Sequence, residues 1–371
     1  MTIIGVPRET KPEEGRVSMT PSVVKQLVEL GHQVRIECSA GESAGFSDQD
    51  YSASGADLVK DEKAWNSDLV VKVKEPISRE YPYLRGQMLF TFLHLSGVDR
   101  LLTERLISSR TTALGYETLE DGEGRLPILA PMSAIAGNVA VQAGAHFLAK
   151  PHGGRGTQLG EVLGIPHGKV VIIGDGVVAQ HAASSALGLG AKVVLLGLDE
   201  AKVSSLLSRY GDRICFLRAP EVQLADLLPG TDLLIGAVLR KGSRADSIVK
   251  RDHIRLLPKG SVVVDVSIDQ GGCIETSRPT SHGSPVFEVD GVIHYAVTNM
   301  PGAYPRTATM ALSNAVEPYV LKLAQCGLDA LSADSGFARS LQTLYGKIRL
   351  ESVAKDLDMI DLYAPNPYLA G

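Results

Sequence analysis

The stretch Lys169-Val-Val-Ile-Ile-Gly-Asp-Gly-Val-Val-Ala179 joins an apolar, mostly β-branched run to a glycine-rich turn. The run predicts a buried strand, and Gly174, Gly176 and Ala179 match the G-x-G-x-x-G/A pattern that links a strand to a helix. The first glycine permits a tight turn, the second lets the backbone approach a pyrophosphate, and the small third residue brings helix and strand together. Because the helix N-terminus then offers amides to the anion, the stretch predicts a dinucleotide-binding unit.

The segments after this unit alternate between short apolar runs and helical patterns. We expect the helix to reach about Leu189 and to stop at Gly190. Strands alternating with crossover helices are typical of a parallel sheet, and about six strands complete a dinucleotide-binding sheet. Further strands are expected at residues 193–196, 214–217, 233–236, 261–265 and 293–297.

The first third of the chain shows the same alternation. Open parallel sheets carry functional residues just past the carboxyl ends of their strands. Lys74, His94 and Tyr116 each follow an expected strand directly. From Arg306 onward the chain is expected to be helical, including the segment SLQTLYGKIRLESVAKDL at 340–357. Strands are expected at residues 34–37, 68–73, 87–93 and 111–115, after a strand-like start, with helices from Pro21, near Asp48 and over 98–109.

Composition limits the class of protein. A chain of 371 residues is long enough for two domains, and 38 glycines with 5% aromatic residues favour an α/β fold. A net charge of -5 without a strongly basic tract argues against a nucleic-acid partner. No apolar stretch reaches the ~18 residues that span a bilayer, and no signal peptide is visible, so a cytoplasmic protein without a membrane partner is expected.

The cysteines give no metal or disulfide pattern. Cys38, Cys215, Cys273 and Cys326 lie far apart, and none belongs to a C-x-x-C pair. We therefore expect reduced, mostly buried thiols and no metal site.

The end of the expected strand 193–196 departs from the dinucleotide pattern. An acidic residue usually stands there and accepts hydrogen bonds from the adenosine ribose. Here Gly197 occupies the position and Asp199 follows, with no cation at the turn and only Lys192 and Lys202 nearby. NAD is the expected cofactor. NADP use stays open, because a missing carboxylate weakens discrimination against the 2′-phosphate.

Ordered segments across nearly the whole chain resemble the alanine dehydrogenase/transhydrogenase family. The resemblance implies an α/β fold of two Rossmann-like doubly wound domains with a cleft between them. An NAD-binding domain of residues 129–304 would be inserted into a substrate domain of residues 1–128 and 305–371, and the assembly would be a homohexamer. The segments are IGVPRETKPEEGRVSMTP, KVKEP, LFTFLHL, LAPMSAIAG, GGRG, IGAVL, VDVSIDQGGCIETSRPT and VTNMPGAYPRTAT.

The resemblance implies two substrate-binding cations. Arg16 corresponds to the arginine that grips the substrate carboxylate, a task suited to the planar guanidinium fork. Without the resemblance, Arg16 would be interpreted as a surface arginine after the acidic pair Glu13-Glu14. Lys74 corresponds to the family's second substrate-binding cation. Without the resemblance, it would be interpreted as a solvated lysine at the end of a strand.

Two further residues match the family's catalytic positions. His94 corresponds to the catalytic histidine, whose pKa range suits proton transfer near neutral pH. Asp269 corresponds to an aspartate that orients water or stabilises the positively charged nitrogen groups. Their alternatives are a hydrogen-bonded core histidine and a turn aspartate before two glycines. Tyr116 is expected to form a wall of the site.

The cofactor contacts that the resemblance implies are largely backbone and apolar. One departure lies nearby: Ala134 and Asn138 replace an acidic and a basic residue that, four apart on a helix, could pair. Their joint loss leaves no unpaired charge, but it leaves the substrate range open. The contacts implied by the resemblance are Met132, Ser133, Val238, Leu239, Ile268, Asp269, Asn299 and Met300. The glycine turn adds Gly174, Gly176, Val177, Val178 and Ala179, and the region at the end of strand 193–196 adds Gly197, Asp199 and Lys202.

The implied reaction is the reversible, NAD-dependent oxidative deamination of L-alanine to pyruvate and ammonium. Arg16 and Lys74 would hold the carboxylate, while His94 and Asp269 would assist the addition of water. Two alternatives stay open. One is an opine-type reductase that joins an amino acid to a keto acid, and the other is a non-catalytic, transhydrogenase-like subunit that binds nicotinamide nucleotide.

Overall fold

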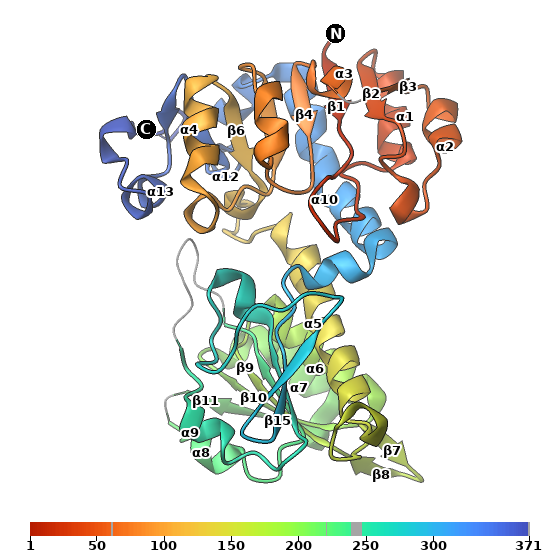
Figure 1. Ribbon diagram of the computed structural model, residues 1–371, viewed down its shortest axis with the longest axis vertical. Coiled ribbons are helices and arrows are strands. Elements are labelled where there is room, and N and C mark those ends of the chain that lie inside the picture. The colour runs from red at the N-terminus through yellow and green to blue at the C-terminus, as the bar shows by residue number, and fades with distance from the viewer. Residues whose placement is uncertain (61, 220, 239–246, 370–371) are drawn as a thin grey trace. The chain divides into compact units, whose positions relative to one another are not determined.

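The chain folds into two compact units. The computed structural model describes residues 1–60, 62–219, 221–238 and 247–369. Unit 1 comprises Met1–Met132 and Tyr304–Gly371, and unit 2 comprises Ser133–Ala303. Each unit contains an open, mainly parallel sheet with helices packed against it (Figure 1). Helix α5, Leu129–Phe147, crosses the first boundary between the units.

The sheet of unit 1 has the strand order β17-β16-β6-β5-β4-β1-β2-β3. Strands β1 to β6 run parallel in a doubly wound order, so the topological switch point lies between β1 and β4. The strands are β1 Ile3–Val6, β2 Gln33–Glu37, β3 Asp57–Val59, β4 Leu69–Val71, β5 Met88–Thr91, β6 Thr112–Gly115, β16 Leu341–Leu344 and β17 Lys347–Ile348. The helices are α1 Pro21–Glu29, α2 Asp48–Ala53, α3 Glu62–Trp65, α4 Arg100–Ser108, α10 Pro305–Cys326, α11 Asp329–Ser332, α12 Ser335–Ala338 and α13 Glu351–Asp356.

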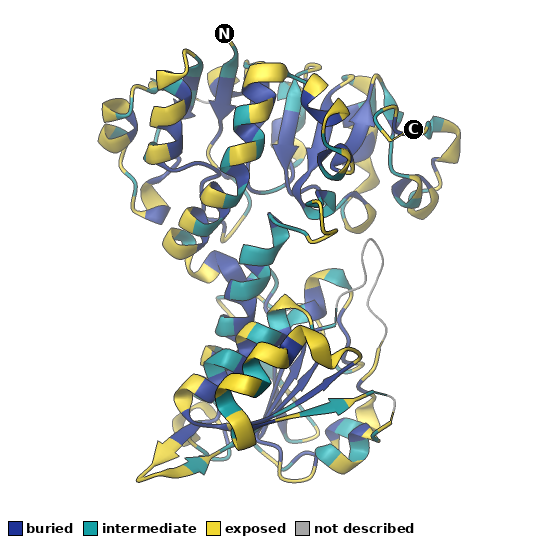
Figure 2. Ribbon diagram, turned by 180° about the vertical axis from the view of Figure 1, so that it is seen from behind, coloured by how far each residue is buried: buried dark blue, intermediate teal, exposed yellow. Residues whose placement is uncertain are grey.

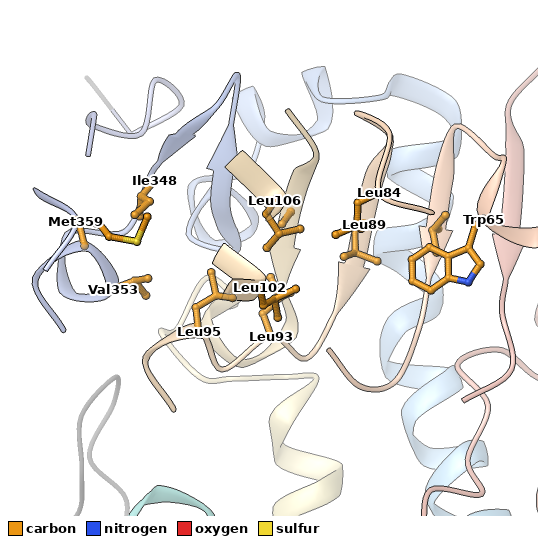
Figure 3. Close-up of a cluster of buried hydrophobic side chains, with 13 residues drawn as sticks. Trp65, Leu84, Leu89, Leu93, Leu95, Leu102, Leu106, Ile348, Val353 and Met359 are labelled. Carbon is orange, nitrogen blue, oxygen red and sulfur yellow. The ribbon is translucent and has the colours of Figure 1, made fainter. Parts of the chain in front are cut away.

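Apolar side chains from distant parts of the chain form the core on one side of this sheet. Leu102 and Leu106 of α4 and Val353 of α13 are buried in the same cluster as Leu89 of β5 and Trp65 of α3 (Figure 3). Burying such side chains stabilises the fold by roughly 1.5–3 kcal/mol each. The core therefore ties the C-terminal segment to the sheet of the N-terminal segment.

The expectation that the C-terminal part is helical throughout is wrong in one segment. Helix α10 forms as expected, but Leu341–Leu344 and Lys347–Ile348 form an antiparallel hairpin, and β16 pairs with β6, the last strand of the parallel series. Tyr345 and Gly346 have φ of 53° and 76°, the positive values that a two-residue hairpin turn requires. The hydrogen bonds that stabilise β16 come from its pairing with β6. The sequence pattern of residues 340–348 alone cannot indicate a partner so distant in the chain.

The sheet of unit 2 has the order β11-β10-β9-β12-β13-β15-β14, again doubly wound, with its switch point between β9 and β12. Its central parallel strands β9, β12, β13 and β15 are buried (Figure 2), as the expected apolar runs required, whereas the edge strand β11 is partly exposed, and only β14 runs antiparallel to its neighbour. The strands are β9 Lys169–Ile173, β10 Lys192–Gly197, β11 Ile214–Arg218, β12 Leu233–Gly236, β13 Val262–Asp265, β14 Val286–Val289 and β15 Val292–Tyr295, with a separate hairpin of β7 Gly160–Val162 and β8 Ile165–His167. The helices besides α5 are α6 Val177–Leu189, α7 Ser204–Tyr210, α8 Leu224–Leu227 and α9 Arg251–Ile254.

The expectation of mostly buried thiols is wrong. Cys273 is buried, but Cys215 and Cys326 are exposed and Cys38 is half-buried. Cys215 lies in β11, the edge strand of its sheet, and Cys326 ends the long helix α10. Position at an edge or at a helix end therefore decides their exposure.

Candidate active site and nucleotide site

Arg16 is buried at the switch point of unit 1. It lies in the loop between β1 and α1, and only 2% of the residue is exposed. Its Nε donates to Oε1 of Glu14 at 2.7 Å, its Nη2 donates to Oε2 at 2.5 Å, and its Nη1 lies 3.1 Å from the sulfur of Met132. The alternative of a surface arginine is therefore wrong.

Glu14 is ionised in this pair. Burial opposes its ionisation, but the charge and hydrogen bonds of Arg16, with the charge of Lys74, lower the pKa of Glu14 to about 2. Lys74 therefore lies close enough to the pair to act on it. The three charges sum to one net positive charge, which suits a small monocarboxylate.

A cavity of about 310 Å³ opens beside Arg16 and Glu14. Most of its lining side chains are polar or charged, so it suits a small, charged ligand rather than an apolar one. Its charged lining consists of Arg8, Glu9, Lys11, Glu14, Arg16 and Arg79.

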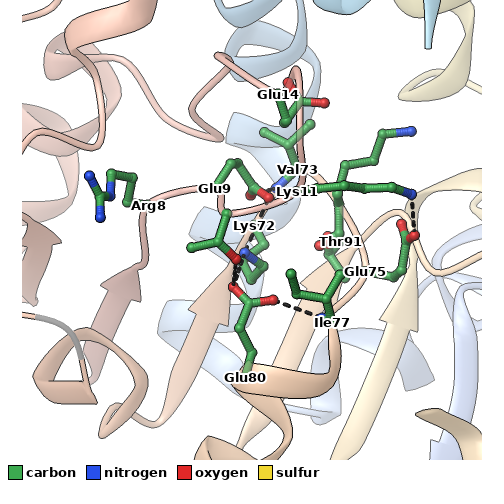
Figure 4. Close-up of polar contacts among 12 residues, drawn as sticks. Arg8, Glu9, Lys11, Glu14, Lys72, Val73, Glu75, Ile77, Glu80 and Thr91 are labelled. Carbon is green, nitrogen blue, oxygen red and sulfur yellow. Dashed lines mark hydrogen bonds and ion pairs between the residues drawn. The ribbon is translucent and has the colours of Figure 1, made fainter. Parts of the chain in front are cut away.

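A buried charge network anchors the end of β4, just before Lys74. The ammonium of Lys72 lies 3.1 Å from Oε2 of Glu9 and 3.2 Å from Oε1 of Glu80, and all three side chains are buried (Figure 4). Glu9 also accepts the amide of Val73 at 2.7 Å. Because breaking a buried pair leaves an uncompensated charge, this network holds the strand end rigidly.

His94 is held in place through its backbone. It follows β5 with a φ of 47°, a left-handed conformation that few residues other than glycine adopt. The amides of Leu93 and His94 donate to the two oxygens of Glu117 at 3.1 and 2.8 Å. The ring of Phe92 stacks on the imidazole with 5.6 Å between centroids, and the buried Tyr116 meets Phe92 edge-on.

The glycine turn of unit 2 has the geometry that a dinucleotide needs. Gly174 has a φ of 125°, and a Cβ there would lie 2.3 Å from the carbonyl oxygen of Ala237. Gly176 caps the N-terminus of α6, and a Cβ there would meet no atom within 4 Å. The open space at the amides of Val177 and Val178 therefore fits a pyrophosphate, while Ala179 is fully buried between helix and sheet.

A carboxylate from the glycine turn lies beside Gly197 at the end of β10. The side chain of Asp175 fills the space beside Gly197, and its Oδ2 accepts the amides of Leu198 and Asp199, each at 2.8 Å. Its Oδ1 lies 3.2 Å from the ammonium of Lys202, one of the two lysines expected near the turn. Lys192 is the first residue of β10, so it lies at the opposite end of this strand from Gly197.

Asp269 lies in a short helix, Val266–Gln270, directly after β13. Its side chain is exposed, and both of its oxygens accept the amide of Asn299 at 3.3 Å. Asn299 follows β15 with a φ of 58°. The strand ends of β13 and β15 therefore position this carboxylate together.

The remaining expected cofactor residues lie along the same carboxyl edge of the unit 2 sheet. Ile268 and Met300 are buried, and the amide of Val238 donates to Oγ of Ser267 at 3.1 Å. Leu239 lies outside the described residues. Ser133 lies half-buried in α5, where Asn138 accepts a hydrogen bond from Ser185 of α6 at 2.7 Å, a neutral contact in place of the charged pair.

The described part of the chain shows neither a cluster of metal ligands nor a membrane-spanning helix. Among residues 1–60, 62–219, 221–238 and 247–369, no group of three or more His, Cys, Asp or Glu side chains could hold a metal ion. Within the same ranges, no helix is long and apolar enough to cross a bilayer.

Comparison with known proteins identifies the family. Residues 5–136 match the family described as "Alanine dehydrogenase/PNT, N-terminal domain", and residues 140–351 match "Alanine dehydrogenase/PNT, C-terminal domain". The chain belongs to the alanine dehydrogenase/PNT family. It is 44% identical to an alanine dehydrogenase of Mycolicibacterium smegmatis, over 96% of this chain and 97% of that protein.

Two further alanine dehydrogenases, one known by sequence and one by structure, are similar to nearly the whole chain. An alanine dehydrogenase of Halomonas elongata is 47% identical over 95% of this chain and 96% of its own length. A solved structure of an L-alanine dehydrogenase superposes with a TM-score of 0.91 at 47% identity, covering 96% of this chain and 99% of that one. The expected fold class of two Rossmann-like units is confirmed.

Sequence reasoning missed three carboxylates of this alanine dehydrogenase/PNT family member. Glu14 had a usable signal, since it stands two residues before Arg16. Asp175 had a weaker one, its place between the two glycines of the turn. Glu117 had none, because its carboxylate accepts the amides of Leu93 and His94 from a segment more than twenty residues away along the chain.

Proposed function

We propose that the protein catalyses the NAD-dependent, reversible oxidative deamination of L-alanine to pyruvate and ammonium. The observation that carries the proposal is the buried pair of Arg16 and Glu14, with the half-buried Lys74 acting on it, at the switch point of unit 1 beside a small charged cavity. The relatives named alanine dehydrogenase, which match nearly the whole chain, support it.

The first step is the binding of the substrate carboxylate by Arg16 and Lys74. Glu14 orients the guanidinium through two hydrogen bonds and compensates one positive charge. The excess charge of the cluster then attracts the carboxylate of alanine or pyruvate, and the rigid strand end before Lys74 fixes where it binds. Such positioning supplies much of the rate enhancement in reactions between two bound partners.

The chemistry at the substrate carbon divides between the cofactor and the protein. NAD, when bound, accepts the hydride that leaves the Cα of alanine. His94 moves the protons that water addition and ammonium release require, and the fixed backbone holds its imidazole in place. Asp269 stabilises the positively charged nitrogen group of the substrate.

The two units divide the binding tasks in this proposal. Unit 1 supplies Arg16, Lys74 and His94 as the substrate domain, and unit 2 supplies the glycine turn as the NAD domain. The dinucleotide contacts along the carboxyl edge of unit 2 belong to the same proposal. We also propose a cytoplasmic homohexamer, and light scattering at six times the chain mass tests the assembly.

The test is a substrate panel with purified protein. NADH should form from NAD⁺ and L-alanine, and NADH should be consumed with pyruvate and ammonium together. NADH consumption with pyruvate and a second amino acid, in the absence of ammonium, would instead identify an opine-type reductase. Nucleotide binding without turnover of any amino acid would contradict the proposal.

A further inference from the structure

The end of β10 has no room for the side chain that a dinucleotide site usually carries there. A Cβ on Gly197 would lie 2.8 Å from the Cβ of Asp175 and 2.9 Å from the ring of Phe216. Carbon atoms that are not bonded do not approach so closely without displacement. Glycine at position 197 is therefore a steric requirement of the aspartate in the neighbouring turn.

The carboxylate of Asp175 lies where it meets the backbone just after β10. Its Oδ2 accepts the amides of Leu198 and Asp199 at 2.8 Å, and its Oδ1 lies 3.2 Å from the ammonium of Lys202. These contacts direct the side chain toward the end of β10, where an acidic residue normally accepts the adenosine ribose hydroxyls. The aspartate of the turn thus occupies the usual position of a carboxylate from the strand.

The carboxylate is ionised and has capacity for one more donor. Burial opposes its ionisation, but the two amides and Lys202 lower the pKa of Asp175 below its ordinary value. A carboxylate offers about four lone-pair sites, and the three contacts above use three of them. The side chain is 12% exposed, so a ligand can reach it.

We propose that Asp175 replaces the missing acidic residue at the end of β10 as the acceptor for the adenosine ribose, and that its ion pair with Lys202 sets the preference for NAD over NADP. The inference rests on the proposed dinucleotide function. The ribose 2′-hydroxyl of NAD donates to the carboxylate. The 2′-phosphate of NADP is repelled by the same carboxylate, and it finds Lys202 already engaged.

The neighbouring Asp175 changes the expected effect of Gly197 on cofactor preference. A glycine in place of the strand carboxylate would by itself relax discrimination between the two cofactors. With Asp175 beside it, the glycine makes space for an acceptor that comes from a different loop. The two positions therefore act as one coupled pair, and the effect of changing one depends on the residue at the other.

The first test measures dissociation constants of NADH and NADPH for the folded protein by fluorescence titration. Asp175→Asn keeps an oxygen for the two amides but removes the charge, so the fold should be retained. We expect NADH to bind about tenfold more weakly and NADPH more tightly, so the ratio of the two constants should fall by more than about tenfold. Asp212→Asn, at the amino edge of the same sheet, is the matched control and should leave both constants unchanged.

The second test measures the coupling between positions 175 and 197. It does not require Asp175→Asn to fold stably. Gly197→Asp alone should weaken NADH binding, because it forces two side chains into one space. Asp175→Gly combined with Gly197→Asp removes the clashing Cβ of Asp175 and returns the carboxylate to the strand. The remaining close contact is with the outer edge of the Phe216 ring, a side chain that can turn to make room. The double variant should recover NADH affinity and preference to within about threefold of the wild type.

The outcomes separate the two proposals. An unchanged NADH to NADPH ratio in Asp175→Asn, or a double variant no better than Gly197→Asp alone, would overturn the role of Asp175 and leave the proposed function standing. Wild-type protein that binds neither nucleotide would overturn both. Wild-type protein that binds NADH but does not oxidise alanine would refute the substrate assignment and leave the role of Asp175 in place.

Discussion

Glu14 and Arg16, two residues apart, form a buried ion pair with two direct contacts of 2.7 and 2.5 Å. The exposed fractions of the two side chains are 0% and 2%. A charged pair removed from water is costly to break, because the remaining partner is left buried and uncompensated. The residue proposed to bind substrate is therefore held by a partner whose protonation controls it.

Replacement of Glu14 should change how stability depends on pH. Its pKa is about 2 when folded against an ordinary value of 4.5, so the pair stabilises the fold above pH 4.5 and loses this contribution as the pH falls toward 2. We expect the wild type to lose up to about 3 kcal/mol more than Glu14→Gln across this interval. Urea unfolding of both proteins at several pH values measures the difference, and parallel curves would show that the pair is not ionised.

Arg16→Lys should weaken substrate binding with little effect on nucleotide binding. A lysine cannot keep two contacts with Glu14 and grip a carboxylate as a fork. The expected loss of about 1.5–3 kcal/mol raises the KM for pyruvate by roughly ten- to hundredfold. Arg105→Lys, on the exposed face of α4, is the control. A KM at the wild-type value would show that the carboxylate binds elsewhere.

His94→Asn should separate catalysis from folding. Asparagine tolerates the left-handed backbone at this position better than alanine does, but it cannot transfer a proton. We expect kcat to fall by about 10²- to 10⁴-fold, while the dissociation constant of NADH stays near that of the wild type. A variant with wild-type turnover would exclude His94 as the proton-transfer residue.

Asp269→Asn should lower turnover in the same way, since it keeps an oxygen for the amide of Asn299 but removes the charge. Steady-state kinetics with alanine and titration with NADH together test this. Retention of kcat would leave Asp269 a purely structural residue of its turn.

Two glycines of the turn after β9 should respond differently to alanine. Gly176 has φ of −77° and open space at its Cβ position, so Gly176→Ala should change stability by less than about 1 kcal/mol, because the reduced entropy of the unfolded chain offsets the poorer N-cap, while NADH binding weakens. Gly174→Ala should destabilise the protein itself, because of its φ of 125° and the contact with Ala237. Thermal unfolding and NADH titration of both variants give the comparison, and equal losses of stability would contradict the assignment.

Local patterns were sufficient for most elements of both sheets. The strand Lys169–Ile173, the helix that ends before Gly190, and the strand Leu233–Gly236 form where the sequence predicts them, because each carries a complete signal within a few residues. The hairpin at 341–348 was mispredicted because its stability comes from pairing with β6, more than two hundred residues earlier in the chain.

The sequence by itself determined the parallel α/β architecture, the glycine turn and the positions of Lys74 and His94 after strands, since strand ends and turns follow from local periodicity. Arg16 and Asp269 were predicted only through the family resemblance. Only the tertiary structure decided which partners the functional and charged side chains contact. It buried Arg16 against Glu14, fixed His94 through Glu117 in the turn after β6, and placed Asp175 in the space that Gly197 leaves. Hydrogen bonds and close contacts between different strands depend on the packing of the whole sheet, and no local pattern in the sequence specifies them.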